Sequence, residues 1–191
     1  MFLAGASGVV GVRLIPLLVA AGHAVAGMTR TPAKVALLRR LGATPVLCDV
    51  FAPENLRQAL AALHPDLVVH LLTDLPDDPA RLPEFAAVCA RIRREGTANL
   101  LAAAKGSGAP RCVAQSVAWP LNGDGGAAVS DLERQVLAAD GVVVRYGRFY
   151  GPGTYHASAP PPPPRIHVDA AALRTLPLLD KPCGIVVLAE D

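Results

Sequence analysis

The sequence predicts an α/β fold in which helices cover both faces of a doubly wound parallel sheet. Short apolar runs of strand length alternate with stretches in which apolar residues recur at helical spacing, and this rhythm is typical of parallel β-α-β units. Short loops with glycine or proline separate them, so right-handed crossovers are the expected connections. The expected strands are residues 2–4, 24–28, 45–48, 67–72, 112–114 and 142–144.

Capping residues and prolines predict where several helices begin and end. Thr31 precedes Pro32 at a first helical position, and Gly42 lies beyond the expected end of that helix. Pro53 opens the next helix in the same way. Pro16 falls inside the first helix and predicts a kink, because proline has no N–H to donate.

A glycine-rich loop at residues 3–12 is the strongest functional signal in the chain. The segment LAGASGVVGV places Gly5, Gly8 and Gly11 between the first strand and the first helix. In such a unit the glycines allow a tight turn, a close approach of backbone N–H groups to a pyrophosphate, and close helix packing. Ser7 adds a hydroxyl at the mouth of the helix, whose N-terminus favours an anion. The loop predicts a dinucleotide phosphate site, and a bare tight turn is the alternative.

Composition, charge and cysteine spacing argue against several other classes of partner. The chain has 191 residues, 52% hydrophobic and 18% charged, which excludes a disordered chain. The net charge is +2, and the clustered arginines lack interleaved aromatics, so no nucleic acid is expected. The four cysteines show no CxxC spacing, which predicts a reducing cytoplasm and no metal site. The apolar run VRLIPLLVAAGHAVA is too short to span a bilayer, so no membrane partner is expected.

A run of consecutive prolines separates the main part of the expected domain from a short C-terminal part. We expect a nucleotide-binding domain over residues 1–154, a stiff proline-rich linker over residues 155–165, and a short remnant over residues 166–191 that completes the same domain. The remnant is expected to form one helix over 168–179 and one strand over 184–188. Because this is too little for an independent substrate domain, the substrate-binding portion is expected to be much reduced.

Several motifs, taken in order, resemble those of a known family. They are GASGVVG at 5–11, GTANLLAAA at 96–104, VAQSVA at 113–118 and VVVRYGRFYGPGT at 142–154. The chain resembles the extended and atypical short-chain dehydrogenase/reductases, in particular the NAD(P)-dependent epimerase/dehydratase family, over about four-fifths of its length by the order of these motifs. The resemblance implies a Rossmann fold and a nicotinamide cofactor.

The residues that follow the second strand bear on the choice of cofactor. An NAD site usually has an acid there that accepts from the ribose 2′-OH, whereas this chain has Arg30. A guanidinium suits a 2′-phosphate, and such a charge-assisted hydrogen bond contributes about 1.5–3 kcal/mol. We therefore expect NADP(H) rather than NAD(H), and an Arg30 that is simply exposed on a loop is the alternative. The expected cofactor-binding residues are Gly5, Ala6, Ser7, Gly8, Val9, Gly11, Thr29, Arg30, Asp49, Val50, Leu71 and Leu72.

Some members of that set have a second interpretation. By resemblance, Asp49 and Val50 border the adenine, with Asp49 accepting from its amino group. Asp49 could equally cap the turn before Pro53. Leu71 and Leu72 would line the cofactor groove, although apolar strand residues are more often core.

The resemblance implies a catalytic serine followed by a YxxxK pair, and the pair is missing. Ser116 matches the serine, where its hydroxyl would bond a substrate oxygen; a hydroxyl satisfied by nearby backbone is the alternative. Gly125 and Val129 stand where the Tyr and Lys would fall, and no YxxxK occurs elsewhere in the chain. Losing general acid–base catalysis typically costs about 10²–10⁴-fold in rate. Tyr150 is the expected replacement acid, with a packing role as the alternative.

Two functions of different classes follow. The first is an NADP(H)-binding atypical short-chain reductase or epimerase/dehydratase-like enzyme that acts on a small carbonyl or hydroxyl substrate. The second is a non-catalytic NADP(H)-binding sensor or interaction module, which the loss of YxxxK and the much reduced substrate-binding portion would permit. By analogy with relatives, the helix around residues 91–104 could supply one face of a homodimer.

Overall fold

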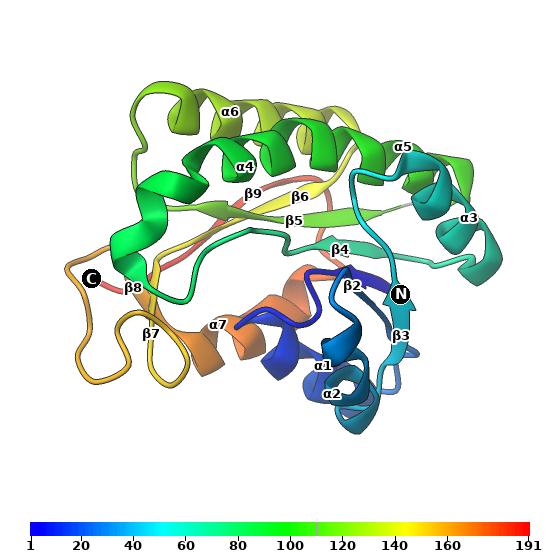
Figure 1. The fold of residues 1–191 in the computed structure, drawn as a ribbon, viewed down its shortest axis with the longest axis horizontal. Coiled ribbons are helices and arrows are strands. Elements are labelled where there is room, and N and C mark those ends of the chain that lie inside the picture. The colour runs from blue at the N-terminus through cyan, green and yellow to red at the C-terminus, as the bar shows by residue number, and fades with distance from the viewer. Residues whose placement is uncertain (110) are drawn as a thin grey trace.

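The computed structural model describes residues 1–109 and 111–191 and is built around one parallel sheet (Figure 1). Seven strands run in the order β3-β2-β1-β4-β5-β6-β9, and each neighbouring pair is parallel. The chain builds outward from β1 in one direction and then returns to build from β4 in the other. This doubly wound order confirms the predicted fold class. The strands are β1 (Phe2–Ala4), β2 (Ala26–Thr29), β3 (Thr44–Leu47), β4 (Val68–His70), β5 (Cys112–Val117), β6 (Val142–Tyr146) and β9 (Gly184–Leu188).

Helices cover both faces of the sheet. Figure 1 shows α3, α4, α5 and α6 on one face and α1, α2 and α7 on the other. A π-helical turn, η3, joins α4 to α5 without a break in helical backbone. The helices are α1 (Gly11–Ala20), α2 (Val35–Arg40), α3 (Pro53–Leu63), α4 (Ala86–Arg91), η3 (Ile92–Gly96), α5 (Thr97–Gly106), α6 (Gly123–Ala138) and α7 (Val168–Thr175).

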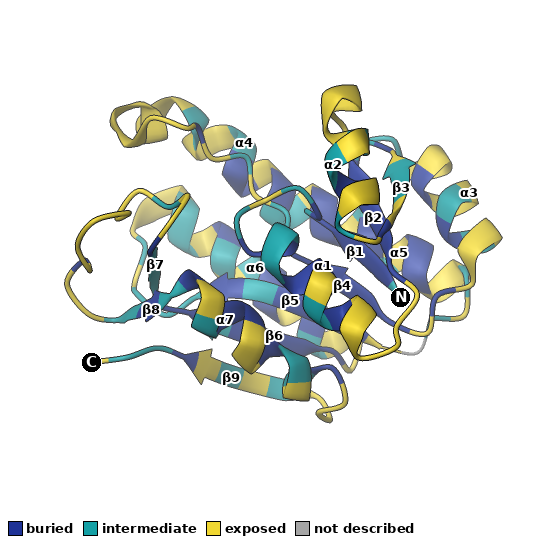
Figure 2. Ribbon diagram, turned by 90° about the horizontal axis from the view of Figure 1, so that it is seen from below, coloured by how far each residue is buried: buried dark blue, intermediate teal, exposed yellow. Residues whose placement is uncertain are grey.

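Side chains alternate along β1 and pack into two separate hydrophobic cores, one on each face of the sheet. Phe2 and Ala4 pack with Leu56 of α3 on one face of the sheet, whereas Leu3 packs with Leu14 of α1 on the other. Strands that are buried on both faces read as continuous apolar runs, and this is why such short segments were recognisable in the sequence. Figure 2 shows these central strands as buried and the outer helix faces as exposed.

The predicted element boundaries agree with the structure in part. Pro53 begins α3 as predicted, and Gly42 follows α2 with a left-handed φ of 93°. Thr31 makes no capping hydrogen bond, and Pro32 opens a 3₁₀ turn, η1 (Pro32–Lys34), before α2. The predicted kink at Pro16, which lies inside α1, stays a prediction.

The predicted strand lengths differ from the observed ones where tertiary pairing decides them. The strand expected over 67–72 is shorter, as β4, and the one expected over 112–114 is longer, as β5. Each residue from Val113 to Val117 has a partner on β6, so pairing extends β5 beyond its apolar run. The helix expected over 168–179 ends earlier, as α7, and a 3₁₀ turn, η4 (Leu176–Leu178), follows it.

The proline-rich segment connects two short strands that the sequence did not predict. β7 (Arg148–Tyr150) and β8 (Arg165–His167) pair in parallel as a separate two-stranded sheet. Arg165, the last residue of the expected linker, therefore belongs to a strand. After α7, β9 pairs with β6 and becomes the edge of the main sheet. Within the two described ranges, no helix is both long enough and apolar enough to cross a membrane.

Candidate functional site

The glycine loop turns sharply at the carboxyl end of β1. Gly5 has a φ of 85°, and a Cβ there would lie 2.6 Å from the carbonyl oxygen of Leu71. A Cβ on Gly11 would lie 2.5 Å from the carbonyl oxygen of Gly5. The Gly8 N–H closes the turn by donating to that same Gly5 oxygen at 3.0 Å. Positions 5 and 11 therefore require glycine, because a side chain would collide with backbone.

The loop leaves backbone donors free at the start of α1. Among the described residues, no acceptor pairs with the N–H groups of Val9 or Val10. Unpaired N–H groups at a helix N-terminus bind anions, and the absence of side chains at Gly5 and Gly8 lets a ligand come close. The loop therefore fits the diphosphate of a nicotinamide dinucleotide.

A cavity opens beside this loop at the carboxyl ends of β1, β2, β3 and β4. It is the place where a doubly wound sheet binds its ligand, next to the switch point between β1 and β4. The predicted cofactor residues that line it are Gly5, Ser7, Gly8, Thr29, Arg30, Asp49, Val50, Leu71 and Leu72. The lining residues that were not among the predicted cofactor-binding residues are Met28, Thr31, Cys48, Phe51, Thr73, Asp74 and Ile92.

Three residues of the predicted set lie outside the cavity lining. Ala6 is fully buried, and Gly11 packs beneath the loop against the carbonyl oxygens of Gly5 and Ala6. Val9 is half-buried, and its backbone N–H has no acceptor among the described residues. These three residues shape the loop, and their side chains do not contact the cavity.

Arg30 contacts an acid that follows β4. Its Nη2 donates to Oδ1 of Asp74 at 2.6 Å, and this pairing raises the pKa of Arg30. The Arg30 side chain is about half exposed. Because a guanidinium carries five N–H donors, this bond to Asp74 leaves others for a ligand in the cavity. The sequence shows Asp74 as one of several acids in the segment LLTDLPDD. No pattern in the sequence indicates that this acid pairs with Arg30.

Asp49 shapes the turn that leads into α3. Its Oδ1 accepts from the Phe51 N–H at 2.9 Å, and its backbone oxygen accepts from the Ala52 N–H at 3.0 Å. The turn-capping interpretation of Asp49 is therefore the one observed in this structure. The residue also lines the cavity, so the expected contact with an adenine stays a prediction.

His70 occupies a buried position at the end of β4. Its Nδ1 accepts from the Leu72 N–H at 3.2 Å, which leaves Nε2 to donate to Thr97 Oγ1 at 3.0 Å. Burial lowers the pKa of His70 to about 4, so the ring is neutral near pH 7. These bonds fix η3 and α5 to the end of β4 and therefore shape one wall of the cavity.

Ser116 belongs to a hydrogen-bonded network that links β5, α6 and β6. Its Oγ donates to Oε1 of Glu133 on α6 at 2.6 Å. Arg145 on β6 donates to both oxygens of the same carboxylate, from Nε at 2.8 Å and from Nη2 at 2.6 Å. Burial raises the pKa of Glu133, but the bonds from Arg145 and Ser116 outweigh it and lower the pKa. The Ser116 hydroxyl is thus satisfied by a side chain, where backbone had been the expected alternative.

Tyr150 lies at the end of β7 and faces the C-terminal residues of the chain. Its hydroxyl donates to Oε2 of Glu190 at 2.9 Å, and this bond is the main reason that its pKa is raised. His167 of β8 packs edge-on against the ring, with the centroids 5.1 Å apart. Neither Ser116 nor Tyr150 lines the cavity. Their catalytic roles stay predictions.

Comparison with protein families and curated proteins gives two matches. The model described as the NAD dependent epimerase/dehydratase family matches residues 1–119. A curated relative, the 3-diazoavenalumate denitrifying reductase of a Streptomyces species, is 40% identical in an alignment that covers 82% of this chain and 58% of the relative. The chain therefore spans less than two thirds of that relative's length.

Solved structures with a similar fold include several proteins bound to nucleotides. The UDP-glucose 4-epimerase of Thermus thermophilus in complex with NAD has a TM-score of 0.79 at 17% identity, covering 98% of this chain and 76% of that one. WbmH of Bordetella bronchiseptica in complex with NAD⁺ has a TM-score of 0.76 at 20% identity, covering 99% of this chain and 74% of that one. At these identities the likeness shows the fold alone.

Proposed function

The chain belongs to the NAD-dependent epimerase/dehydratase family, and from that premise we propose that it is an NADP(H)-binding reductase that interconverts a small carbonyl compound and the corresponding hydroxyl compound. The observation that carries the proposal is the glycine loop: Gly5, Ser7 and Gly8 line the same cavity as Arg30, and the Val9 and Val10 N–H groups that follow have no acceptor among the described residues. Because the curated relative is named a reductase, we favour reduction over epimerisation or dehydration.

Preference for NADP(H) over NAD(H) is the part of the proposal that rests on Arg30. The residue follows β2 at the position where an NAD site usually places an acid, and its guanidinium lines the cavity. Asp74 holds the guanidinium there without using all of its donors. A 2′-phosphate would add a second, more highly charged partner to the same group.

The chemistry proposed for the site needs few groups from the protein. When bound, a reduced nicotinamide supplies a hydride to an electrophilic atom of the substrate. For a carbonyl substrate, the oxygen must also receive a proton, and the chain offers the Ser116 and Tyr150 hydroxyls for this task. Each hydroxyl would first have to leave its carboxylate partner, Glu133 or Glu190.

A diazo compound is a second candidate substrate, because the curated relative is named for a denitrifying reduction of one. Replacing a diazonium group by hydrogen consumes one hydride and releases N₂ (R–N₂⁺ + H⁻ → R–H + N₂). No oxygen gains charge in this reaction, so no proton donor is required. The absence of a YxxxK pair from the chain is consistent with such a substrate.

A non-catalytic NADP(H) sensor is the alternative to both reductase proposals. The Ser116 and Tyr150 hydroxyls, which are already bonded to carboxylates, favour it, because neither is free to act on a substrate. We also propose a homodimer and a cytoplasmic location. The free thiols of Cys48, Cys89, Cys112 and Cys183 are consistent with a reducing compartment.

Titration with NADPH and with NADH tests the proposed cofactor. We expect the wild type to bind NADPH about tenfold or more tightly than NADH, and Arg30→Ala to remove that difference. Arg39→Ala is the matched control, because Arg39 is an exposed arginine at the end of α2. Equal binding of the two cofactors, unchanged in Arg30→Ala, would show that the role given to Arg30 is wrong.

Turnover separates the enzyme from the sensor. NADPH oxidation is followed by absorbance with a panel of small aldehydes and ketones and with an arenediazonium salt, in the wild type and in Ser116→Ala and Tyr150→Phe. Carbonyl reduction that falls in either variant supports the first proposal. Diazonium reduction that survives in both variants supports the second. Tight NADPH binding without any turnover supports the sensor.

A further inference from the structure

Arg93 differs from every other arginine in the described part of the chain. The others either bond to a protein atom or are exposed, whereas Arg93 is half-buried and has no hydrogen-bond or ion-pair partner there. Burial lowers the pKa of Arg93, and the nearby Cys89 opposes that effect only in part. Its guanidinium nitrogens still reach solvent, since no buried side-chain nitrogen or oxygen among the described residues lacks a hydrogen-bond partner. Arg93 can therefore donate to an anion that comes from outside the chain.

The helix that carries Arg93 is anchored at both adjacent turns. One turn earlier, the Cys89 Sγ donates to the carbonyl oxygen of Asp74 at 3.4 Å. One turn later, Thr97 is bonded to His70 at the end of β4. Because Arg93 lies four residues from each of them, it shares their face of the helix, which is turned toward the carboxyl end of β4. Its neighbour Ile92 lines the cavity.

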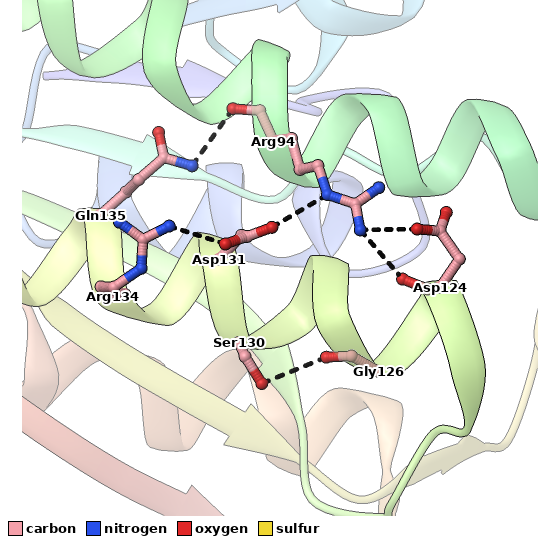
Figure 3. Close-up of polar contacts among 7 residues, drawn as sticks. All are labelled: Arg94, Asp124, Gly126, Ser130, Asp131, Arg134 and Gln135. Atoms are coloured by element: carbon pink, nitrogen blue, oxygen red, sulfur yellow. Dashed lines mark hydrogen bonds and ion pairs between the residues drawn. The ribbon is translucent and has the colours of Figure 1, made fainter.

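Arg94, the residue after Arg93, does have partners, and they lie on α6. Figure 3 shows Arg94 directed toward α6, where its Nε donates to Asp131 at 2.9 Å and its Nη2 to Asp124 at 2.6 Å. Gln135 of α6 donates to the Arg94 carbonyl oxygen at 3.2 Å and so fixes the backbone of η3. Arg94 therefore engages Asp124 and Asp131 of α6, and Gln135 holds the backbone of the turn that also carries Arg93.

The helix that carries Arg93 is bonded to the carboxyl end of β4, the first strand of the second half of the sheet. In a doubly wound sheet a dinucleotide spans the switch point, so that one nucleotide lies over β1 to β3 and the other over β4 to β6. Arg30 and Asp49 occupy the first half. Arg93, placed beyond the end of β4, therefore belongs to the half in which the reactive end of the cofactor meets a substrate.

We propose that Arg93 is the anion receptor of the substrate site and selects substrates that carry a carboxylate or phosphate group. The inference rests on the proposed reductase function and names the class of substrate. A guanidinium binds either anion through two parallel N–H···O bonds, which fixes the orientation of the substrate as well as its charge. Arg93 is a specificity residue in this proposal and transfers no proton.

A pair of probes that differ only in charge tests the proposal. 4-Carboxybenzaldehyde and its neutral methyl ester are compared as substrates with NADPH for the wild type, Arg93→Gln and Arg93→Lys. We expect Arg93→Gln to lower kcat/KM for the carboxylate about 10- to 100-fold and to leave the ester unchanged. Arg93→Lys should recover part of the loss. Arg174→Gln, which removes an exposed arginine of α7, is the matched control and should change neither value.

Binding measurements keep this test separate from that of the reductase. Benzoate, phenyl phosphate and neutral benzamide are titrated into protein saturated with NADP⁺, and the two anions distinguish a carboxylate from a phosphate site. If no variant turns over any substrate, the reductase proposal fails, but loss of anion binding in Arg93→Gln still supports the receptor. The receptor is wrong if the wild type binds benzoate and phenyl phosphate no better than benzamide. It is also wrong if Arg93→Gln weakens NADPH binding as much as anion binding, because Arg93 would then serve the cofactor.

Discussion

The two halves of the carboxyl edge of the sheet differ in what their polar groups contact. Over β1 to β3, the Val9 and Val10 N–H groups have no acceptor among the described residues, and Arg30 lines the cavity with N–H donors that Asp74 does not use. On the other side of the switch point, the hydroxyls of Ser116 on β5 and of Tyr150 on β7, in the separate two-stranded sheet, are already bonded to carboxylates. The first half can receive a ligand without losing internal bonds. In the second half, a substrate that bonds to either hydroxyl must first displace its carboxylate partner.

This difference shows why recognition of a nucleotide and catalysis are separate questions in this chain. Free donors beside a cavity contribute their full interaction to a ligand, whereas a donor that must first leave a protein acceptor contributes only the difference. The glycine loop therefore supports binding without supporting a reaction. Arg93 is the exception in the second half, because no described residue competes for its guanidinium.

A substitution in the glycine loop, in the half of the edge over β1 to β3, should have the largest effect on stability and on NADPH binding. In Gly5→Ala, the new Cβ lies against the Leu71 carbonyl oxygen and the residue keeps a positive φ, so we expect a loss of roughly 3 kcal/mol of stability and the loss of NADPH binding. Gly106→Ala is the control, since nothing lies within 4 Å of its Cβ. Urea unfolding and NADPH titration measure both effects. Equal stability and affinity in the two variants would contradict the assigned role of the turn.

His70, between the two halves, should make stability depend on pH. Its pKa is about 4 in the folded chain and near 6.5 when unfolded, so the unfolded state binds more protons between these values. Stability should therefore rise with pH from 4 to 6.5, by up to about 3 kcal/mol. Urea unfolding at pH 5 and pH 7 measures the rise, which should be smaller in His70→Gln. An identical pH dependence in wild type and variant would exclude His70 as its source.

Breaking the second half should affect stability and leave nucleotide binding intact. Glu133→Gln removes the charge that pairs with Arg145 and should cost about 2 kcal/mol, less than for a fully buried pair because Arg145 reaches solvent. NADPH affinity should not change, since none of the three network residues lines the cavity. Glu84→Gln, in the exposed Glu84–Arg81 pair, is the control and should be neutral. A large drop in NADPH affinity in Glu133→Gln would show that the two halves are coupled.

The smallest effect, on NADPH affinity alone, should come from removing the Asp74 carboxylate that pairs with Arg30. Asp74→Asn removes the carboxylate that competes with a 2′-phosphate, so we expect NADPH affinity to rise about two- to fivefold while NADH affinity stays the same. Fluorescence titration with both cofactors measures the change. Weaker NADPH binding in this variant would mean that Asp74 positions Arg30 for the phosphate instead of competing with it.

Much of the fold was predictable because its signals are local. Pro53 begins α3, and the buried strands read as apolar runs, since each depends on residues close in sequence. The paired strands β7 and β8 were not predictable. They are short, and a proline-rich loop separates them, so only their pairing across that loop makes them strands.

The sequence by itself determined the α/β alternation, the glycine loop and the arginine that follows β2, because local backbone geometry and residue type fix these features. Only the tertiary structure decided which polar groups are free. Asp74 meets Arg30 across 44 positions, and Glu133 accepts from both Ser116 and Arg145, which lie on different strands. Such contacts depend on how distant segments pack. For the same reason, only the folded chain distinguishes Arg93, which has no partner among the described residues, from its paired neighbour Arg94.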